Sequence, residues 1–458
     1  MTRPPSILTI AGSDSGGGAG IQADLKTIAM LGGYGASVIT ALTAQNTRAV
    51  TGIQAPSAKF VALQLTTVLD DIRIDAAKTG MLFSGPIIKA IAPILAERRF
   101  PLVVDPVCVS TSGAKLLKDE GVEALMDLIF PLADLVTPNR PEAELLTGMT
   151  IRSRDDVFRA ARLLLGMGPK AVLIKGGHAD SLAVTDWYVA AGAEPMPFMQ
   201  QRVDTGCTHG TGCTLSAAIA TGVGQGLAMD TAILRAQKYL NLALRSGYPL
   251  GQGGGPPNHL APWLKECARA EILGGLERLG RRLVLMPGLA PLVPRTGANV
   301  AVALPHADDD SEVAAFSCGI VRSRRGDLVV AGCPAFGASA RTAATLLACS
   351  RLRPETGCVM TLALPPRLRA TLERFDVPVA WMNREHKPGY VGEDDGRFES
   401  WAAFEAMRAH ADPASVQAVA DPGGFAGEPV VRLLAKDIPS LEAALCRIIE
   451  RMGTDEDD

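Results

Sequence analysis

A cysteine stands inside a glycine-rich run, Thr208-His-Gly-Thr-Gly-Cys-Thr214, which small residues follow over 215–221. Gly210 and Gly212 allow the backbone to turn tightly so that its N–H groups converge, and a helix beginning there would add its positive end. That geometry can hold a phosphoryl group in transfer and spread its charge in the transition state. A thiol at a helix start has a lowered pKa, so Cys213 is a candidate base for a substrate hydroxyl. The alternative is a tight turn before a buried helix.

A second glycine-rich segment, 11–20, follows the first predicted strand. It has five glycines in the nine residues 12–20, which permits close approach of the backbone to a ligand. The segment is neither a Walker A loop nor a dinucleotide fingerprint. Asp24, in the helix that follows, is a candidate acceptor for a polar substrate, and an exposed first-turn acid is the equal alternative.

Other polar side chains stand where predicted strands end. Gln45 offers one acceptor and two donors, which suits an aminopyrimidine edge. Asp105 and Glu142 are candidate carboxylates for Mg²⁺, and Lys175 is a candidate for a nucleotide phosphate. Each such position alone is more often a strand cap or a solvated charge. The case becomes strong because five strand ends carry such groups, in the segments 43–47, 78–81, 105–107, 137–142 and 175–178.

To act together, these side chains require a sheet in which the carboxyl ends of the strands lie at the same edge. The first 250 residues alternate short apolar runs with amphipathic stretches. The runs are Ser6–Ile10, Ser37–Ala41, Leu102–Asp105, Ala133–Thr137 and Ala171–Lys175. Continuous apolar strands separated by helices predict a mainly parallel sheet covered on both faces. Ligands bind at the carboxyl ends of the strands in such α/β folds.

Composition limits the function classes. The chain has 458 residues with 47% hydrophobic and 20% charged residues, so two to four folded domains are expected, and general disorder is excluded. A net charge of −3 without a long basic run disfavours a nucleic-acid or anionic-membrane surface. No apolar stretch is long enough to span a membrane, and the first residues do not form an export signal. Nine cysteines without a CxxC pair argue against disulfides or zinc, so we expect a reduced, cytoplasmic protein.

The chain is predicted to divide near residue 250. Glycine and proline cluster over 251–257, which indicates a flexible connection, and Pro262–Leu279 has the pattern of a helix. We therefore expect four parts: a first domain over 1–250, a linker and connecting helix over 251–284, a smaller α/β domain over 285–452, and an acidic tail over 453–458.

Residues 6 to about 248 resemble hydroxymethylpyrimidine/phosphomethylpyrimidine kinase of the ribokinase superfamily. The matching segments are IAGSDSGGGAGIQADLKT, TALTAQNT, KTGML, VVDPV, TPNRPEAE, IKGGH and THGTGCTLSAAIA, in the family's order. The resemblance implies a three-layer sandwich, a homodimer, and two successive ATP-dependent phosphorylations of 4-amino-5-hydroxymethyl-2-methylpyrimidine. A minor departure is Cys108, where the family often has methionine.

The family's roles fall on matching positions of this sequence. They place Gly12, Asp24, Gln45, Met81 and Val107 around the pyrimidine, Asp105 and Glu142 with Mg²⁺, Lys175 and Asn139 with ATP, Gly210, Thr211 and Gly212 in the anion hole, and Cys213 as the base.

Residues 285 to about 450 resemble the archaeal-type thiamine-phosphate synthase domain through short segments, among them 292–299 and 336–339. Gly319 stands where the family has an arginine, and Arg341 where it has a histidine. Asn383 replaces an aspartate and Gly427 a basic residue. Since expelling pyrophosphate calls for fixed cationic groups, we expect this domain to be non-catalytic, with a thiamine-pathway phosphate as a candidate ligand.

Other functions remain as alternatives. They are a complete kinase–synthase fusion, a pyridoxal or pyridoxine kinase, and a kinase whose second domain senses thiamine phosphate. Gln45 with Met81 favours the pyrimidine, whereas a sugar kinase would usually have aspartate in place of Cys213. The absence of a helix-turn-helix pattern disfavours DNA binding.

Overall fold

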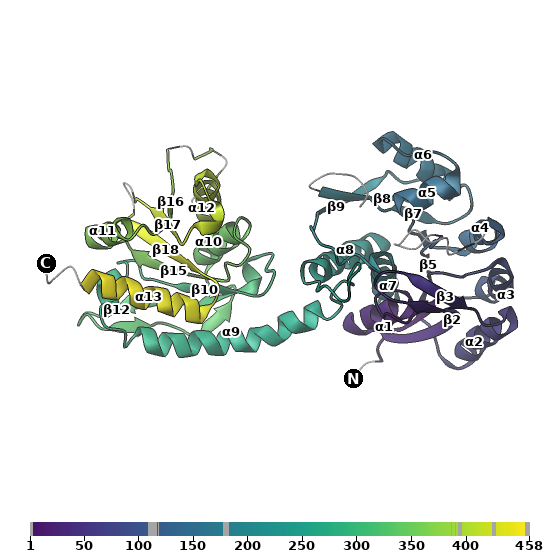
Figure 1. Cartoon of the computed structure of the whole chain (residues 1–458), viewed down its shortest axis with the longest axis horizontal. Helices are drawn as coiled ribbons and strands as arrows, with labels where there is room; N and C mark the ends of the chain where they lie inside the picture. The colour runs from purple at the N-terminus through teal and green to yellow at the C-terminus, as the bar shows by residue number, and fades with distance from the viewer. Residues whose placement is uncertain are drawn as a thin grey trace. The chain divides into compact units, whose positions relative to one another are not determined.

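The computed structural model describes residues 3–108, 117, 119–176, 183–385, 387–389, 391–392, 396–423 and 427–453. The predicted strand-end residue His178 and the acidic tail beyond Gly453 lie outside these residues. The chain forms two compact units, Met1–Trp263 and Leu264–Asp458 (Figure 1).

The first unit is built on a nine-stranded sheet with the order β3-β2-β1-β4-β5-β6-β7-β8-β9. Its strands are β1 (Ser6–Asp14), β2 (Tyr34–Gln45), β3 (Val50–Gln54), β4 (Ala76–Thr79), β5 (Leu102–Val104), β6 (Leu135–Val136), β7 (Ala171–Ile174), β8 (Ala183–Ala190) and β9 (Met196–Gln201). The six strands from β2 to β7 in this order are parallel, whereas β3, β8 and β9 are antiparallel to their neighbours. The five predicted strands are all present.

Helices cover both faces of this sheet, which confirms the predicted three layers (Figure 1). One face carries α1 (Gly20–Met30), α7 (Thr211–Gly224) and α8 (Met229–Arg245); the other carries α2 (Ala58–Asp71), α3 (Gly85–Ala96) and α6 (Arg154–Leu165). The short helices α4 (Asp119–Ala124) and α5 (Arg140–Thr147) complete the unit. Side chains alternate along β1, so Ile7 packs in the first of these cores while Leu8 and Ile10 pack in the second.

The glycine-rich segment 251–257 is not the flexible connection that its composition predicts. It packs on the first unit: the Gly253 N–H donates to Thr47 Oγ1 (3.2 Å), and Gly255 O accepts from the His209 N–H (3.0 Å). Its glycines allow close backbone approach, since a methyl group on Gly253 would collide with the Thr47 carbonyl. The predicted helix follows as α9 (Ala261–Leu283).

The second unit has a seven-stranded, mainly antiparallel sheet with the order β14-β11-β10-β15-β18-β17-β16. These strands are β10 (Val300–Ala303), β11 (Val313–Phe316), β14 (Pro334–Phe336), β15 (Cys358–Ala363), β16 (Val379–Trp381), β17 (Ala418–Asp421) and β18 (Val430–Ala435). A separate hairpin pairs β12 (Ile320–Arg322) with β13 (Leu328–Val330).

Helices lie on both faces of this second sheet as well. They are α9, α11 (Pro366–Arg374) and α13 (Ile438–Gly453) on one core, and α10 (Ala340–Ser350) and α12 (Arg397–Ala409) on the other. The prediction of a second α/β domain is therefore confirmed. Among the helices of the described chain, none has the length and apolar character of a membrane span.

Candidate active site

A cavity of about 850 Å³ opens at the carboxyl ends of the parallel strands of the first unit, where the sequence predicts the ligands. Its size is that of a small-molecule site. The predicted site residues that line it are Gly12, Gln45, Met81, Asp105, Val107, Asn139, Glu142, Lys175, Gly210, Thr211, Gly212 and Cys213. These residues come from six strand ends and one helix start, so the fold brings together groups up to 201 positions apart (213 minus 12).

The start of α7, where the sequence predicts an anion hole, lines the cavity. Gly210 precedes the helix with a φ of +85°, and a methyl group there would collide with the Gly18 carbonyl, so glycine is required. A methyl group on Gly212 would lie 3.3 Å from Asp105 Oδ2 and 3.4 Å from Lys175 Nζ. The first turn of α7 therefore faces the charged groups at the ends of β5 and β7, with the positive end of the helix toward the cavity.

Cys213 is the third residue of α7 and is partly buried on the cavity wall. The expectation of a lowered thiol pKa is wrong for this structure, because burial raises the pKa of Cys213 to about 12. The charge of Lys78 and the Gly20 N–H oppose the rise but do not cancel it. Desolvation is thus the largest effect on this pKa, and the resting side chain is a thiol.

Three charged side chains meet beside the anion hole. Lys175 Nζ lies 3.0 Å from Asp105 Oδ1 and 4.0 Å from Glu142 Oε2. Burial raises the pKa of Glu142 to about 7, and Asp105 adds to the rise, while Lys175 opposes it. Glu142 therefore titrates near neutral pH.

These carboxylates fit a magnesium ion that is shared with a phosphate ligand. Mg²⁺ commonly binds through one or two carboxylates, substrate phosphates and water, rather than in a cage of protein ligands. In the described part of the chain, no three His, Cys, Asp or Glu side chains are grouped as metal ligands. A site made of Asp105 and Glu142 thus needs the phosphates to complete it.

Asn139 has a role in the fold besides its place on the cavity wall. Asn139 Oδ1 accepts a hydrogen bond from the Glu142 N–H (2.8 Å), and Glu142 Oε2 accepts one from the Asn139 N–H (2.8 Å). This capping box begins α5 and fixes the Glu142 carboxylate at the helix start. The Asn139 side-chain oxygen thus accepts in the cap, and its amide nitrogen is the donor that suits a phosphate oxygen of ATP.

The predicted contact between Asp24 and the substrate is not supported, because Asp24 does not line the cavity. It lies in α1 with no exposure to solvent, where it accepts hydrogen bonds from Lys78 and from Thr9 Oγ1 (2.6 Å). Its carboxylate forms a buried ion pair with Lys78. Burial raises the pKa of Asp24, and Lys78 opposes that rise.

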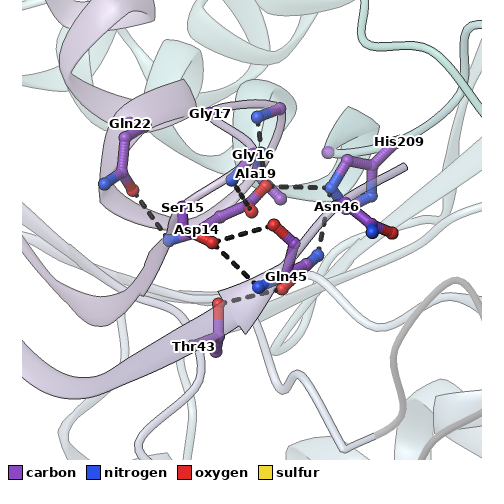
Figure 2. Close-up of polar contacts among 12 residues, drawn as sticks. Asp14, Ser15, Gly16, Gly17, Ala19, Gln22, Thr43, Gln45, Asn46 and His209 are labelled. Carbon is purple, nitrogen blue, oxygen red and sulfur yellow. Dashed lines mark hydrogen bonds and ion pairs between the residues drawn. The ribbon is translucent and has the colours of Figure 1, made fainter. Parts of the chain in front are cut away.

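Asp14 and His209 are functional candidates that the sequence analysis missed. Both line the cavity, and Figure 2 shows them around Gln45. Asp14 Oδ2 accepts from the N–H groups of Gly18 (3.0 Å) and Ala19 (2.9 Å), so this carboxylate holds the glycine-rich loop. Burial alone would raise the pKa of Asp14, but His209 and the N–H groups of Ala19 and Gly16 outweigh it and keep the pKa below its usual value.

Comparison with known proteins decides the family. Residues 14–258 match the sequence model of the family described as phosphomethylpyrimidine kinase, which is more than half of the chain. The chain belongs to the phosphomethylpyrimidine kinase family. Residues 275–447 match the model described as thiamine-phosphate synthase ThiN. Both resemblances seen in the sequence are thereby confirmed.

Individual relatives agree with this assignment. The chain is 52% identical to the thiamine biosynthesis bifunctional protein ThiED of Geobacter sulfurreducens over 56% of this chain, but it spans only 52% of that relative. It is 45% identical to hydroxymethylpyrimidine/phosphomethylpyrimidine kinase of Streptomyces coelicolor over 56% of this chain and 94% of that one. Among solved structures, an ADP complex of Bacillus subtilis pyridoxal kinase matches with a TM-score of 0.53 and 34% identity, covering 57% of this chain and 99% of that chain.

In this member of the phosphomethylpyrimidine kinase family, the second unit has Gly319 where the synthase pattern has an arginine. The backbone conformation at this position favours glycine. Gly319 has a φ of +78°, and a methyl group there would lie 2.5 Å from the Ala298 carbonyl oxygen. An arginine at this position would be strained. The glycine is therefore built into the turn before β12.

The other positions of the synthase pattern are engaged in local contacts. Arg341, in the first turn of α10, lies 3.6 Å from Glu399 and is largely exposed. Arg384 forms a two-bond ion pair with Asp421 (2.9 and 2.6 Å). Asn383 Oδ1 accepts from the Glu385 N–H (2.9 Å). The cationic groups at these positions of the synthase pattern are thus arginines, and none of them is a histidine.

Proposed function

We propose that the first unit transfers the γ-phosphoryl group of ATP to the hydroxymethyl group of 4-amino-5-hydroxymethyl-2-methylpyrimidine, and then a second phosphoryl group to the phosphate of that product. The observation that carries the proposal is a single cavity lined by Cys213, the glycines before it, Lys175 and the two carboxylates. The family assignment supports it, since relatives with these motifs are named hydroxymethylpyrimidine/phosphomethylpyrimidine kinases.

The reaction follows from the placement of these groups. The substrate hydroxyl oxygen forms a bond to the γ-phosphorus, the bond from that phosphorus to the bridging oxygen breaks, and ADP leaves. The N–H groups at the start of α7 and the Lys175 ammonium stabilise the charge that spreads over the transferring oxygens. Mg²⁺ held by Asp105 and Glu142 would neutralise phosphate charge.

Cys213 takes the hydroxyl proton in this proposal. It does so from a minor ionised population, since its thiol pKa is about 12. Lys78 and the Gly20 N–H favour the thiolate. A high pKa makes the thiolate scarce, but it also makes it a strong base once it forms.

An assay of ADP release with Mg²⁺ and ATP tests the proposal. The purified full chain should release ADP with the pyrimidine alcohol and with its monophosphate. Pyridoxal is the competing substrate to include, because the solved pyridoxal kinase is a structural relative. A folded protein that releases ADP with neither pyrimidine would overturn the proposal.

For the second unit, we propose a non-catalytic domain that binds a phosphorylated compound of the thiamine pathway. The absence of catalysis is supported by Gly319 and Arg341, which stand where the synthase pattern has an arginine and a histidine. A thermal-shift and calorimetric titration of the full chain with thiamine phosphate, with the pyrimidine monophosphate as the competing ligand, tests it. Absence of any binding that survives saturation of the kinase site would contradict it.

For the cellular location, we propose the cytoplasm. None of the nine cysteines forms a disulfide in the part of the chain that the structure describes, as expected in a reducing compartment. For assembly, the resemblance implies a homodimer, which sedimentation of the full chain would test.

A further inference from the structure

The side-chain amide of Gln45 lies between two hydrogen-bonding partners. On one side, His209 Nε2 lies 3.2 Å from Gln45 Nε2; on the other, Thr43 Oγ1 lies 3.1 Å from Gln45 Oε1 (Figure 2). The backbone of Gln45 is held as well, since its N–H donates to Ser15 Oγ (2.8 Å) and its carbonyl accepts from the same hydroxyl (2.8 Å). The backbone of Gln45 is therefore fixed at the cavity. Its side-chain amide could still place the oxygen and the NH₂ group in either of two opposite directions.

Asp14 determines which proton His209 carries. The Asp14 carboxylate can only accept hydrogen bonds, and its lowered pKa keeps it ionised. Its Oδ2 lies 3.0 Å from His209 Nε2. The contact is attractive only if Nε2 carries a proton, which holds for the imidazolium and for one neutral tautomer. An unprotonated Nε2 would direct a lone pair at the carboxylate.

A protonated His209 Nε2 cannot accept a hydrogen bond from the Gln45 amide nitrogen. The oxygen and nitrogen of a primary amide have nearly the same shape, so the surrounding network decides their places. The consistent arrangement directs the Gln45 oxygen toward the His209 Nε2–H, which Gln45 then shares with Asp14 Oδ2, and the Gln45 NH₂ toward Thr43. The hydroxyl of Thr43 then accepts from the amide and donates to the Ser13 carbonyl (2.9 Å). Each of these contacts then joins a donor to an acceptor.

We infer that His209, oriented by Asp14, is a positioning residue that fixes the direction of the Gln45 amide and thereby selects a 4-aminopyrimidine edge over its 4-oxo counterpart. The inference rests on the proposed function and names how that site chooses its substrate. In the fixed direction, Gln45 presents one free acceptor and one free donor in a set order. An aminopyrimidine matches this order with its exocyclic NH₂ and its ring N3. A 4-oxopyrimidine has the donor and the acceptor exchanged.

The order also fixes the orientation of the bound ring. With the amide reversed, an aminopyrimidine would have to turn over to pair with Gln45, which would move its neighbouring hydroxymethyl group to the other side of the contact. A fixed amide thus excludes the inverted ring as well as the oxo analogue. Mismatched buried donors and acceptors weaken binding strongly, because each is left without a partner.

The experiment measures discrimination between 4-amino- and 4-oxo-5-hydroxymethyl-2-methylpyrimidine, both as a ratio of kcat/KM and as a ratio of dissociation constants. The wild-type protein should favour the amino compound by roughly 100-fold or more. In His209→Leu the ratio should fall to within about tenfold, since the amide can then rotate. His209→Gln, which retains an N–H donor at a similar reach, should keep most of the ratio. Thr43→Val should lower it, because the partner on the other side is lost.

Cys207→Ala is the matched control, as Cys207 lies two positions from His209, is buried, and does not line the cavity. It should leave the ratio at the wild-type value. If His209→Leu and Thr43→Val lower kcat/KM for both compounds equally, with the ratio unchanged, His209 has only a structural role and the inference is overturned. The binding ratio needs no turnover, so it tests the inference even where the proposed phosphorylation fails.

Discussion

Lys78 Nζ lies 3.1 Å from both carboxylate oxygens of Asp24, and neither side chain has any exposure to solvent. The pair joins β4 to α1 beneath the cavity, close enough to Cys213 for the charge of Lys78 to lower the thiol pKa. Burial lowers the pKa of Lys78, but Asp24, Cys213 and Asp105 outweigh it, so the ammonium persists. This relationship makes Asp24 part of the support for the active site.

Replacing one partner of this pair should damage the first unit severely. Lys78→Met leaves a buried carboxylate without its cation, and loss of one partner of a buried pair costs about 3–5 kcal/mol. The double variant Asp24→Asn/Lys78→Met removes both charges and should recover much of that loss. Urea unfolding of the full chain compares these two variants with the wild type. A Lys78→Met protein as stable as the wild type would show that water or another group satisfies Asp24.

Cys213 should control turnover more than substrate binding. Cys213→Ala should lower kcat by roughly 10²–10⁴-fold, the usual contribution of a positioned base, and leave the dissociation constant of the pyrimidine nearly unchanged. Because burial raises the thiol pKa to about 12, the thiolate fraction of the wild type rises about tenfold for each pH unit below that value.

The pH dependence separates a base from a packing residue at this position. Wild-type kcat should keep increasing through alkaline pH until another step limits it, whereas Cys213→Ala should lose that dependence. Cys207→Ala serves as the control and should behave as the wild type. Full activity of Cys213→Ala would assign the side chain to packing.

Local patterns in the sequence were enough to predict the position of the cavity, because each site motif follows its own strand. Pairing between distant residues was not predictable in this way. Asp24 was predicted to contact the substrate, with an exposed first-turn acid as the alternative, since its partner lies 54 positions away on β4. His209 gave no signal because its partners Gln45 and Asp14 are 164 and 195 positions away. The segment 251–257 had the composition of a linker, and only the fold shows that its glycines allow packing against Thr47.

Glu142 should make magnesium-dependent nucleotide binding sensitive to pH. Its pKa is raised to about 7, so at pH 6 most of the carboxyl is protonated and is a poor metal ligand, while at pH 8 it is ionised. The affinity for ADP in the presence of Mg²⁺ should therefore increase between pH 6 and 8. Glu142→Gln should bind weakly at both values. Calorimetry with and without Mg²⁺ measures this, and a pH dependence that persists in Glu142→Gln would assign it to another group.

The same group affects stability with the opposite sign. The folded protein holds the Glu142 proton to a higher pH than the unfolded chain does, so stability falls as pH rises from the unfolded pKa to about 7. Glu142→Gln removes this dependence and keeps a side-chain oxygen that can accept from the Asn139 N–H in the capping box. The melting temperature of the variant minus that of the wild type should therefore be more favourable to the variant at pH 8 than at pH 5. A difference in melting temperature that is equal at both pH values would contradict the raised pKa.

The full chain should not form thiamine phosphate from the pyrimidine diphosphate and thiazole phosphate. No imidazole stands at position 341, and Arg341 is engaged with Glu399. Chromatographic detection of thiamine phosphate, against a mixture without protein, measures the reaction. Clear product formation would establish a kinase–synthase fusion.

The backbone at Gly319 predicts that a larger residue cannot be introduced there. Gly319 and Gly326 both have positive φ, +78° and +92°. An alanine at either site would therefore lose about 1–2 kcal/mol of stability, because its backbone would have to adopt the left-handed conformation. At Gly326 the space is open, whereas at Gly319 the new methyl group would lie 2.5 Å from the Ala298 carbonyl oxygen. Gly319→Ala should therefore be less stable than Gly326→Ala by roughly 1–3 kcal/mol. Gly319→Arg should weaken the unit in the same way and restore no synthase activity. Urea unfolding of the full chain compares the two alanine variants, and equal stabilities would show that the turn before β12 can shift to admit a side chain.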